Sequence, residues 1–343
     1  MTGGSTAGRA VSIAGVGAYL PEKVVGLDFF FDGPPPDDPM LHSPLVGPPP
    51  LRHHVAPDQR ASDMIYRAAT PLLKRLGIAA TDIDILLTNV LVPDELFTGC
   101  GAETAALLGC APPWTIDLHN TGCASFGYMM RLAGVLISTG QARTALLANV
   151  QNAGGQIFSQ SQVRLLPQAR TPGDGCGVAV LTADDRSPLL GTAVRNTPSA
   201  AADLRVGAEG RKYWEPGTGQ VDVRFDPSRT QETLALGNRV VPEVVRELCE
   251  DIGVKVTDID VLVTNQPNRT FLRNWRDDLG IPPERHVDTY DTLGNLYGAG
   301  LPVNLDHALR GGRVRPGDLV VVAGFAHAGD FAAAAAFRWQ ANA

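Results

Sequence analysis

One cysteine in the sequence stands at a position suited to nucleophilic chemistry. Cys123 follows Gly122 and precedes a run of small and apolar residues that is predicted to form a helix. A sulfur at a helix N-terminus lies close to the positive end of the helix dipole, which favours thiolate over thiol. Backbone N–H groups at such a turn also point toward an acyl oxygen. We therefore predict that Cys123 carries an acyl group as a thioester.

The other four cysteines lack this context. They are Cys100, Cys110, Cys176 and Cys249, and none belongs to a CxxC pair or has histidines at zinc-ligand spacing. A free cysteine is most often a small buried hydrophobe, and this role is also the alternative for Cys123. We expect packing roles for these four residues, no disulfide framework, and neither a metal nor a cofactor.

A repeated segment relates Cys123 to a second polar residue. Thr81–Asn89 (TDIDILLTN) and Thr257–Asn265 (TDIDVLVTN) match at seven of nine positions, which indicates an internal duplication. Each copy is followed by a helical stretch, a Pro-Pro pair, a strand and a sharp turn. Cys123 lies in the turn of the first copy and Asn295 in the turn of the second, so the two residues are near counterparts.

Helical and strand patterns alternate around both copies, which favours parallel sheets with right-handed crossovers. The predicted helices are Ala61–Leu76, Ala124–Thr139, Val240–Ile252 and Leu296–Leu309, and the predicted strands include Ile83–Val92, Ala145–Val150 and Asp318–Ala323. Two such repeats facing each other give a five-layer α/β/α/β/α arrangement. We place the halves at residues 1–185 and 186–343, with the repeated segments as central strands and a site where the paired turns converge.

Composition narrows the function classes. The chain has 343 residues, of which 44% are hydrophobic and 19% charged, as in an ordinary globular protein. Its net charge of −7 argues against a nucleic-acid partner. Because the sequence shows neither a signal peptide nor an apolar run of about 18 residues, we expect a cytoplasmic protein without a membrane partner.

Eight prolines between Asp32 and Pro50 predict an irregular loop or cap.

Several motifs, in this order along the chain, resemble the ketoacyl-ACP synthase III branch of the thiolase superfamily over essentially the full length. They are Gly15–Pro21 (GVGAYLP), Gly173–Leu181 (GDGCGVAVL), Gly294-Asn295, and the turn, strand and loop of Gly311–Phe325. The resemblance implies a thiolase fold with Cys123 as the active-site cysteine and Asn295 as the active-site asparagine. It also implies a homodimer with the strand Ala145–Val150 near the interface, and an acyl-CoA or acyl carrier protein as acyl donor.

The chain departs from the family at a catalytic position. Where the family has His-Gln-Ala-Asn, this chain has Asn265-Gln266-Pro267-Asn268, so Asn265 replaces the catalytic histidine. An asparagine donates a hydrogen bond but has no titrating nitrogen. By the resemblance, that histidine helps to stabilise the carbanion formed from a malonyl thioester, so its replacement disfavours carbon–carbon bond formation.

Two further departures concern the base and the mouth of the site. The family has Phe-Gly-Gly-Gly in the terminal loop, whereas this chain has Phe325–Gly329 with His327 inside it. His327 is therefore either a relocated base or a packing residue, and His119, expected to face packing, is the next candidate. The proline-rich segment overwrites the Trp and Arg that grip the adenine of CoA in the family, which favours a carrier-protein donor or an acceptor other than malonyl.

Three functions follow from this combination of features. The first is an acyltransferase of specialised, antibiotic-type metabolism that passes an acyl group from Cys123 to a hydroxyl or amine of a small molecule. The second is a decarboxylative ketoacyl synthase that tolerates Asn265. The third is a catalytically silent partner of an active thiolase-fold subunit, although the intact Cys123 and Asn295 speak against it. We rank them in this order.

Overall fold

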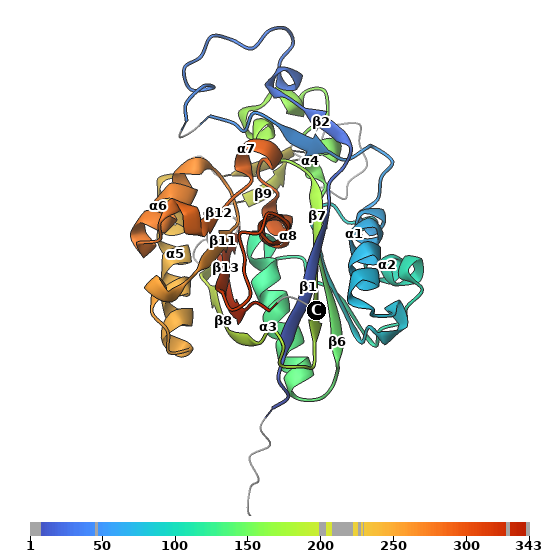
Figure 1. Ribbon diagram of the computed structural model, residues 1–343. Helices are drawn as coiled ribbons and strands as arrows, with labels where there is room; N and C mark the ends of the chain where they lie inside the picture. The colour runs from blue at the N-terminus through green and yellow to red at the C-terminus, as the bar shows by residue number, and fades with distance from the viewer. Residues whose placement is uncertain are drawn as a thin grey trace, which may run out of the picture.

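The computed structural model describes residues 8–44, 47–198, 204–207, 222–225, 228, 230–326 and 330–340. Two five-stranded sheets form its centre (Figure 1). The strands of the first sheet are β1 (Ser12–Tyr19), β4 (Ile85–Val90), β5 (Trp114–Asp117), β6 (Thr144–Gln151) and β7 (Gly175–Thr182). Those of the second are β8 (Leu189–Asn196), β11 (Val261–Thr264), β12 (His286–Val287), β13 (Leu319–Ala326) and β14 (Phe331–Arg338).

The two sheets have the same strand order and the same pairing directions. The first runs β5-β4-β6-β7-β1 and the second β12-β11-β13-β14-β8. In each sheet the first three strands are parallel and the last two are antiparallel to their neighbours. The two repeated segments contribute β4 and β11, which lie between two neighbours in their sheets. The duplication in the sequence is therefore a duplication of the fold.

Helices form three layers around these sheets (Figure 1). The outer face of the first sheet is covered by α1 (Ala61–Leu76) and α2 (Gly101–Leu108), and the outer face of the second by α5 (Thr230–Asp251) and α6 (Arg269–Leu279). Between the sheets lie α3 (Ser125–Ser138) and α8 (Gly300–Arg310), whose apolar residues share one core cluster with both sheets. This is the predicted α/β/α/β/α arrangement.

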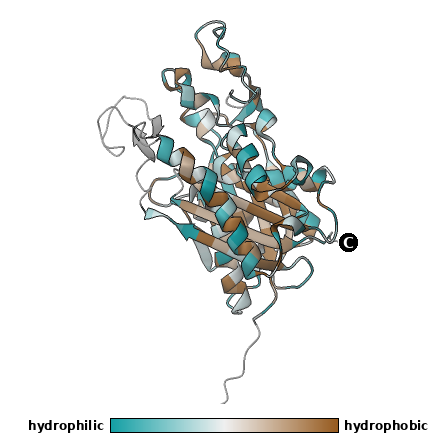
Figure 2. Ribbon diagram, turned by 90° about the vertical axis from the view of Figure 1, so that its left-hand side faces the viewer, coloured by the Kyte–Doolittle hydropathy of each residue, from teal (hydrophilic) through white to brown (hydrophobic). Residues whose placement is uncertain are grey.

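Hydrophobic periodicity explains the outer helices. In α1, which has the predicted bounds, Met64, Ile65 and Leu72 are fully buried against the first sheet. The helix ends at Gly77, whose φ of 66° is left-handed and whose N–H donates to the carbonyl of Leu73. Figure 2, seen from the α5 side, shows the same principle, with hydrophilic positions on the helix in front and mainly hydrophobic strands behind it.

Each repeated segment begins with a 3-10 turn rather than with a strand. These turns are η2 (Ala80–Asp82) and η8 (Val256–Asp258), so β4 starts two residues later than predicted. The second aspartate of each copy accepts hydrogen bonds from the backbone at the start of the neighbouring parallel strand. Asp84 Oδ2 accepts from the N–H groups of Arg143 and Thr144 at 2.7 and 3.1 Å, and Asp260 Oδ2 accepts from the N–H of Leu319 at 2.9 Å.

A cap lies above the sheets, at the top of Figure 1. It contains β2 (Lys23–Val25), η1 (Leu27–Phe30), β3 (Arg52–His54), α4 (Ala153–Gln156), η4 (Val163–Leu165) and η5 (Pro167–Arg170). Phe30, Phe158 and Val163 form its small apolar core. The described part of residues 32–50 has no helix or strand, as its prolines predict. A separate two-stranded sheet pairs β9 (Leu204–Gly207) with β10 (Asp222–Phe225).

One expectation about assembly concerns a central strand. The strand Ala145–Val150, expected near a subunit interface, belongs to β6, which is hydrogen-bonded to β4 on one side and β7 on the other. All six of these residues are buried. A central strand has no free edge with which to pair.

No helix within the described ranges combines the length and the apolar character needed to cross a bilayer.

Candidate active site

A cavity of about 280 Å³ lies where the carboxyl ends of parallel strands from both sheets converge. Its lining includes the ends of β4 and β6, the Cys123 turn, the residue after β11, and the end of β13. Cys123, Asn265 and Asn295 all line it. Strand ends at such a junction are the usual place for ligands in α/β folds. The fold therefore brings three of the sequence-predicted site residues to one cavity.

Cys123 lies in η3 (Gly122–Ala124), directly before α3. Gly122 has a φ of 43°, a left-handed conformation that suits glycine and turns the chain sharply into the helix. The cysteine is only 8% exposed. Burial raises the pKa of its thiol to about 12, although hydrogen bonds from its own backbone and from Asn265 oppose the rise. Desolvation therefore acts against the thiolate that the helix end favours.

Asn265 is held by the backbone of the neighbouring strand. Its Nδ2 donates to the carbonyl of Phe325 at 3.2 Å, and its Oδ1 accepts from the N–H of Phe325 at 3.3 Å. Its hydrogen bond to the Cys123 thiol favours the ionised sulfur. Gly324 leaves room for this contact, since a Cβ there would lie 3.0 Å from Asn265 Oδ1. The amide is thus fixed beside the nucleophile.

Asn295 follows α7 (Tyr290–Leu293) and precedes η10 (Tyr297–Ala299). Its N–H donates to Thr171 at 2.9 Å, and its carbonyl accepts from the N–H of Gly173 at 3.1 Å, so its backbone is fixed on both sides. Its Oδ1 accepts from the N–H of Tyr297 at 3.0 Å, which leaves Nδ2 as the group that can donate to a substrate oxygen. Tyr297, also at the cavity, has an unusual φ of 45°.

Two histidines were candidate bases. His119 lies beyond Asp117, the last residue of β5, and is exposed at the cavity that Cys123 lines. The expectation that it faces packing is wrong, because it lies in the loop after the sheet edge rather than inside the strand. His327 lies outside the described residues, in the stretch after β13.

The remaining cysteines have no part in the cavity. Cys100, Cys176 and Cys249 are buried and Cys110 is half-buried, all with free thiols. Among the described residues, no group of three His, Cys, Asp or Glu side chains is placed to hold a metal ion.

Sequence reasoning missed three polar residues that line the cavity: Asn89, Gln151 and Tyr297. Asn89 lies near the carboxyl end of β4, and Gln151 is the last residue of β6. A signal was available, because a polar residue that ends an apolar parallel strand lies at the edge where ligands bind. The sequence does not reveal that these ends face Cys123.

Comparisons with known proteins agree with this geometry. The model of 3-oxoacyl-[acyl-carrier-protein (ACP)] synthase III matches residues 116–198, and the model of its C-terminal part matches residues 249–339. A β-ketoacyl-[acyl-carrier-protein] synthase III from Xanthomonas oryzae is 30% identical over 91% of this chain and 94% of its own. The corresponding protein from Thermosynechococcus vestitus is 31% identical over 84% and 87%.

Solved structures show the same relationship. The 3-oxoacyl-(acyl carrier protein) synthase III of Pseudomonas aeruginosa superposes with a TM-score of 0.84 at 27% identity, covering 98% of this chain and all of that one. A variant of OleA from Xanthomonas campestris, at 20% identity and a TM-score of 0.80 over 96% of this chain and 99% of that one, shares the fold. The chain has the thiolase fold and belongs to the 3-oxoacyl-[acyl-carrier-protein] synthase III family of acyl-transferring enzymes.

Proposed function

We propose that this enzyme takes an acyl group from a carrier-protein or CoA thioester onto Cys123 and passes it to a hydroxyl or amine of a small molecule, within specialised metabolism. The observation that carries the proposal is Asn265. The resemblance aligns it with a catalytic histidine, yet its amide is tied to the backbone of Phe325 and has no titrating nitrogen. This arrangement supports a reaction that needs no stabilised carbanion.

The proposed reaction has two steps. In the first, the Cys123 sulfur attacks the thioester carbonyl, its proton passes to a base, and the donor thiolate leaves and is protonated. In the second, the acceptor oxygen or nitrogen attacks the acyl-cysteine, loses its proton to the base, and the cysteine thiol is restored. Asn295 Nδ2 and backbone N–H groups of the turn donate to the acyl oxygen as negative charge develops on it.

A base is needed because the buried thiol is protonated at neutral pH. Two histidines are proposed for this role. His119 is supported by its position at the cavity. His327 is supported by its position in the terminal loop, which the resemblance places close to the active-site cysteine. The variants His119→Ala and His327→Ala test the two histidines separately. Loss of the base that takes the Cys123 proton prevents loading, whereas loss of a base that serves only the second step reduces transfer while an acyl-cysteine still accumulates.

Decarboxylative condensation is the second candidate. It is supported by the names of the relatives, which are β-ketoacyl-[acyl-carrier-protein] synthases III at up to 31% identity. It requires Asn265 and Asn295 together to hold the malonyl thioester oxygen as carbanion character develops. A silent partner subunit is the weakest candidate, since a scaffold does not need a cavity lined by Cys123, Asn265 and Asn295.

The deciding experiment is intact-mass spectrometry of the enzyme incubated with a panel of acyl-CoA and acyl-carrier thioesters. We expect a mass gain that Cys123→Ala abolishes, whereas Cys110→Ala and Cys176→Ala retain it because those thiols do not line the cavity. The acyl-enzyme should then release its acyl group to alcohols or amines. It should release no carbon dioxide from malonyl-CoA or a malonyl-carrier protein. Robust malonyl-dependent ketoacyl product would place condensation first.

Several features of the assembly also stay proposals. We propose that the chain consists of two halves, residues 1–185 and 186–343. The boundary between them lies in the connection between β7 and β8. We propose a homodimer and a cytoplasmic location, where acyl-CoA and carrier-protein thioesters are made. A continuous pairing of two β5 edges would support the dimer, because β5 pairs only with β4 among the described strands.

A further inference from the structure

A buried amide without hydrogen-bond partners lines the cavity. Gln151 is the last residue of β6, and its side chain is fully buried. Neither its Oε1 nor its Nε2 has a hydrogen-bond partner among the described residues. Native proteins pair nearly all of their buried polar atoms, because an unpaired one loses its bonds to water without replacement. Because Gln151 is also part of the cavity lining, a polar group that enters the cavity is a candidate partner for this amide.

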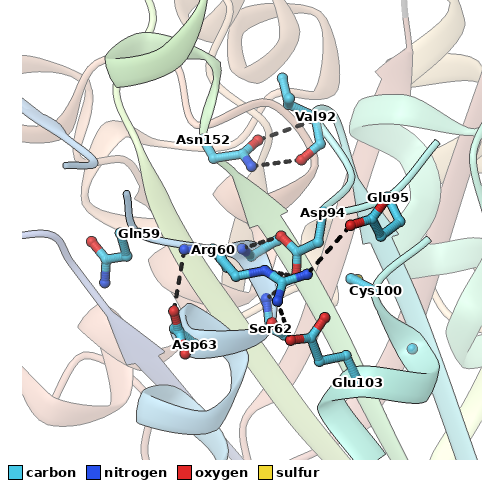
Figure 3. A network of polar contacts seen from close by, with 12 residues as sticks. Gln59, Arg60, Ser62, Asp63, Val92, Asp94, Glu95, Cys100, Glu103 and Asn152 are labelled. Carbon is cyan, nitrogen blue, oxygen red and sulfur yellow. Dashed lines mark hydrogen bonds and ion pairs between the residues drawn. The ribbon is translucent and has the colours of Figure 1, made fainter. Parts of the chain in front are cut away.

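The backbone around Gln151 is fixed, and the burial of the side chain keeps its amide away from solvent. Gln151 pairs with Gly175, where β6 and β7 are hydrogen-bonded to each other. The next residue, Asn152, donates from Nδ2 to the carbonyl of Val92 at 2.7 Å and accepts at Oδ1 from the N–H of Val92 at 3.1 Å (Figure 3). These bonds tie the end of β6 to the segment after β4.

The same segment is anchored a second time. Asp94 accepts from the N–H groups of Ala61 and Ser62 at 2.6 and 3.0 Å, at the start of α1 (Figure 3). Leu91 lies in the cavity wall just before these anchors. Gln151 is therefore a positioned polar group beside apolar wall residues such as Val150 and Leu91.

We propose that Gln151 is a specificity-determining residue that hydrogen-bonds a neutral polar substituent, a hydroxyl or an amide, on the acyl chain carried by Cys123. The inference rests on the loading step of the proposed function. A hydroxyl or amide can accept from Nε2 or donate to Oε1, whereas a saturated chain can do neither. The described lining contains no lysine or arginine, which disfavours a carboxylate on the acyl chain.

The size of the cavity limits the length of this chain. A volume of about 280 Å³ lies at the lower end of the roughly 300 to 1,000 Å³ that is typical of small-molecule sites. This space must also admit the attacking acceptor. The preferred acyl groups are therefore short, with a hydroxyl or amide a few carbons from the thioester.

The test compares isosteric acyl-CoA pairs that differ only by a hydroxyl in place of a methyl group. Suitable pairs are 3-hydroxybutyryl and 3-methylbutyryl, 4-hydroxybutyryl and pentanoyl, and 5-hydroxypentanoyl and hexanoyl. The rate of acyl loading on Cys123 is measured by intact mass, so that no acceptor is needed. For at least one pair we expect the hydroxyacyl group to load about tenfold or more faster, because its absence leaves the buried amide unpaired.

Gln151→Leu should abolish or invert this preference by speeding the loading of the plain chain and slowing that of the hydroxyacyl chain. The matched control is Gln156→Leu, the same change in α4 at a residue that does not line the cavity, which should keep the wild-type ratio. A purely structural role for Gln151 would lower both rates together and leave their ratio unchanged.

Equal loading of every pair by the wild-type enzyme, with no change of ratio in Gln151→Leu, overturns the inference while acyl transfer through Cys123 stands. Failure of every thioester in the panel, plain or hydroxylated, to acylate Cys123 overturns the proposed function itself. If Gln151→Leu does not fold, a comparison within the wild-type enzyme still decides, since the absence of any hydroxyl preference contradicts the inference.

Discussion

The nucleophile shows how two local effects compete at one residue. The position of Cys123 before α3 favours the thiolate by up to about 2 kcal/mol, the upper range of a helix end. Its burial has the opposite effect. A rise in the thiol pKa from its ordinary 9.0 to about 12 corresponds to roughly 4 kcal/mol against ionisation. Burial is the larger effect, so the sulfur must lose its proton during the reaction rather than before it.

This competition predicts the pH dependence of thiol alkylation. Below its pKa the thiolate fraction rises about tenfold per pH unit. The rate of iodoacetamide modification at Cys123, followed by peptide mass spectrometry, should therefore keep rising from about pH 7 to about pH 10 without a plateau. Free cysteine in the same reaction provides the control, and it should level off near its ordinary pKa. A plateau for Cys123 near neutral pH would show that a thiolate exists at rest.

At the scale of elements, the repeated segments align the strands that build the cavity. Asp84 and Asp260 are the fourth residues of the two TDID copies. At the start of the neighbouring parallel strand, Asp84 accepts from two N–H groups and Asp260 from one. Fixing the start of β6 and β13 also fixes where these strands end, at Gln151 and near Phe325. The repeat therefore has a structural reason, and it acts at the end of each sheet opposite the cavity.

The hydrogen bonds between Asp84 and the start of β6 are here called the Asp84 clamp, and Asp84→Asn measures their contribution to stability. The variant loses the charge that strengthens two hydrogen bonds to the backbone, so we expect the free energy of unfolding to fall by about 1 to 2 kcal/mol. Urea denaturation measures the change. Asp82→Asn, the same substitution at an exposed residue of η2, should stay within about 0.5 kcal/mol of the wild type. Equal effects of both substitutions would argue against the clamp.

Much of this element pattern could be predicted from the sequence, because it depends on local periodicity. The bounds of α1 follow from its apolar spacing and Gly77, and the facing turns of Cys123 and Asn295 follow from the duplication. What could not be predicted depends on contacts between distant segments. The burial that raises the Cys123 pKa, the exposure of His119 and the unpaired amide of Gln151 all result from how the two sheets and their loops meet.

At the scale of the whole molecule, three of the exposed apolar residues lie in or close to the strand at one sheet edge. β5 is the outermost strand of the first sheet, and Trp114 at its start is 36% exposed. Leu96 and Phe97 are 60% and 96% exposed, in a segment that reaches β5 through Gly99, where a Cβ would lie 2.6 Å from Asp117. An unpaired edge flanked by large apolar side chains is a surface suited to a partner. This places the proposed dimer contact at β5 rather than at the central strand β6.

The dimer can be tested by removing one outward N–H from that edge. In β5 the N–H of Trp114 donates to the carbonyl of Asp84, and the N–H of Leu118, just after the strand, donates to the carbonyl of Thr88. Because N–H groups alternate in direction along a strand, the N–H of Thr115 faces away from β4. Thr115→Pro removes this donor without touching the ladder to β4. We expect a dimer for the wild type and for the control Thr115→Val, and a folded monomer for Thr115→Pro, by sedimentation velocity with circular dichroism as the check on folding. A wild-type monomer, or a proline variant that remains dimeric, would contradict pairing at β5.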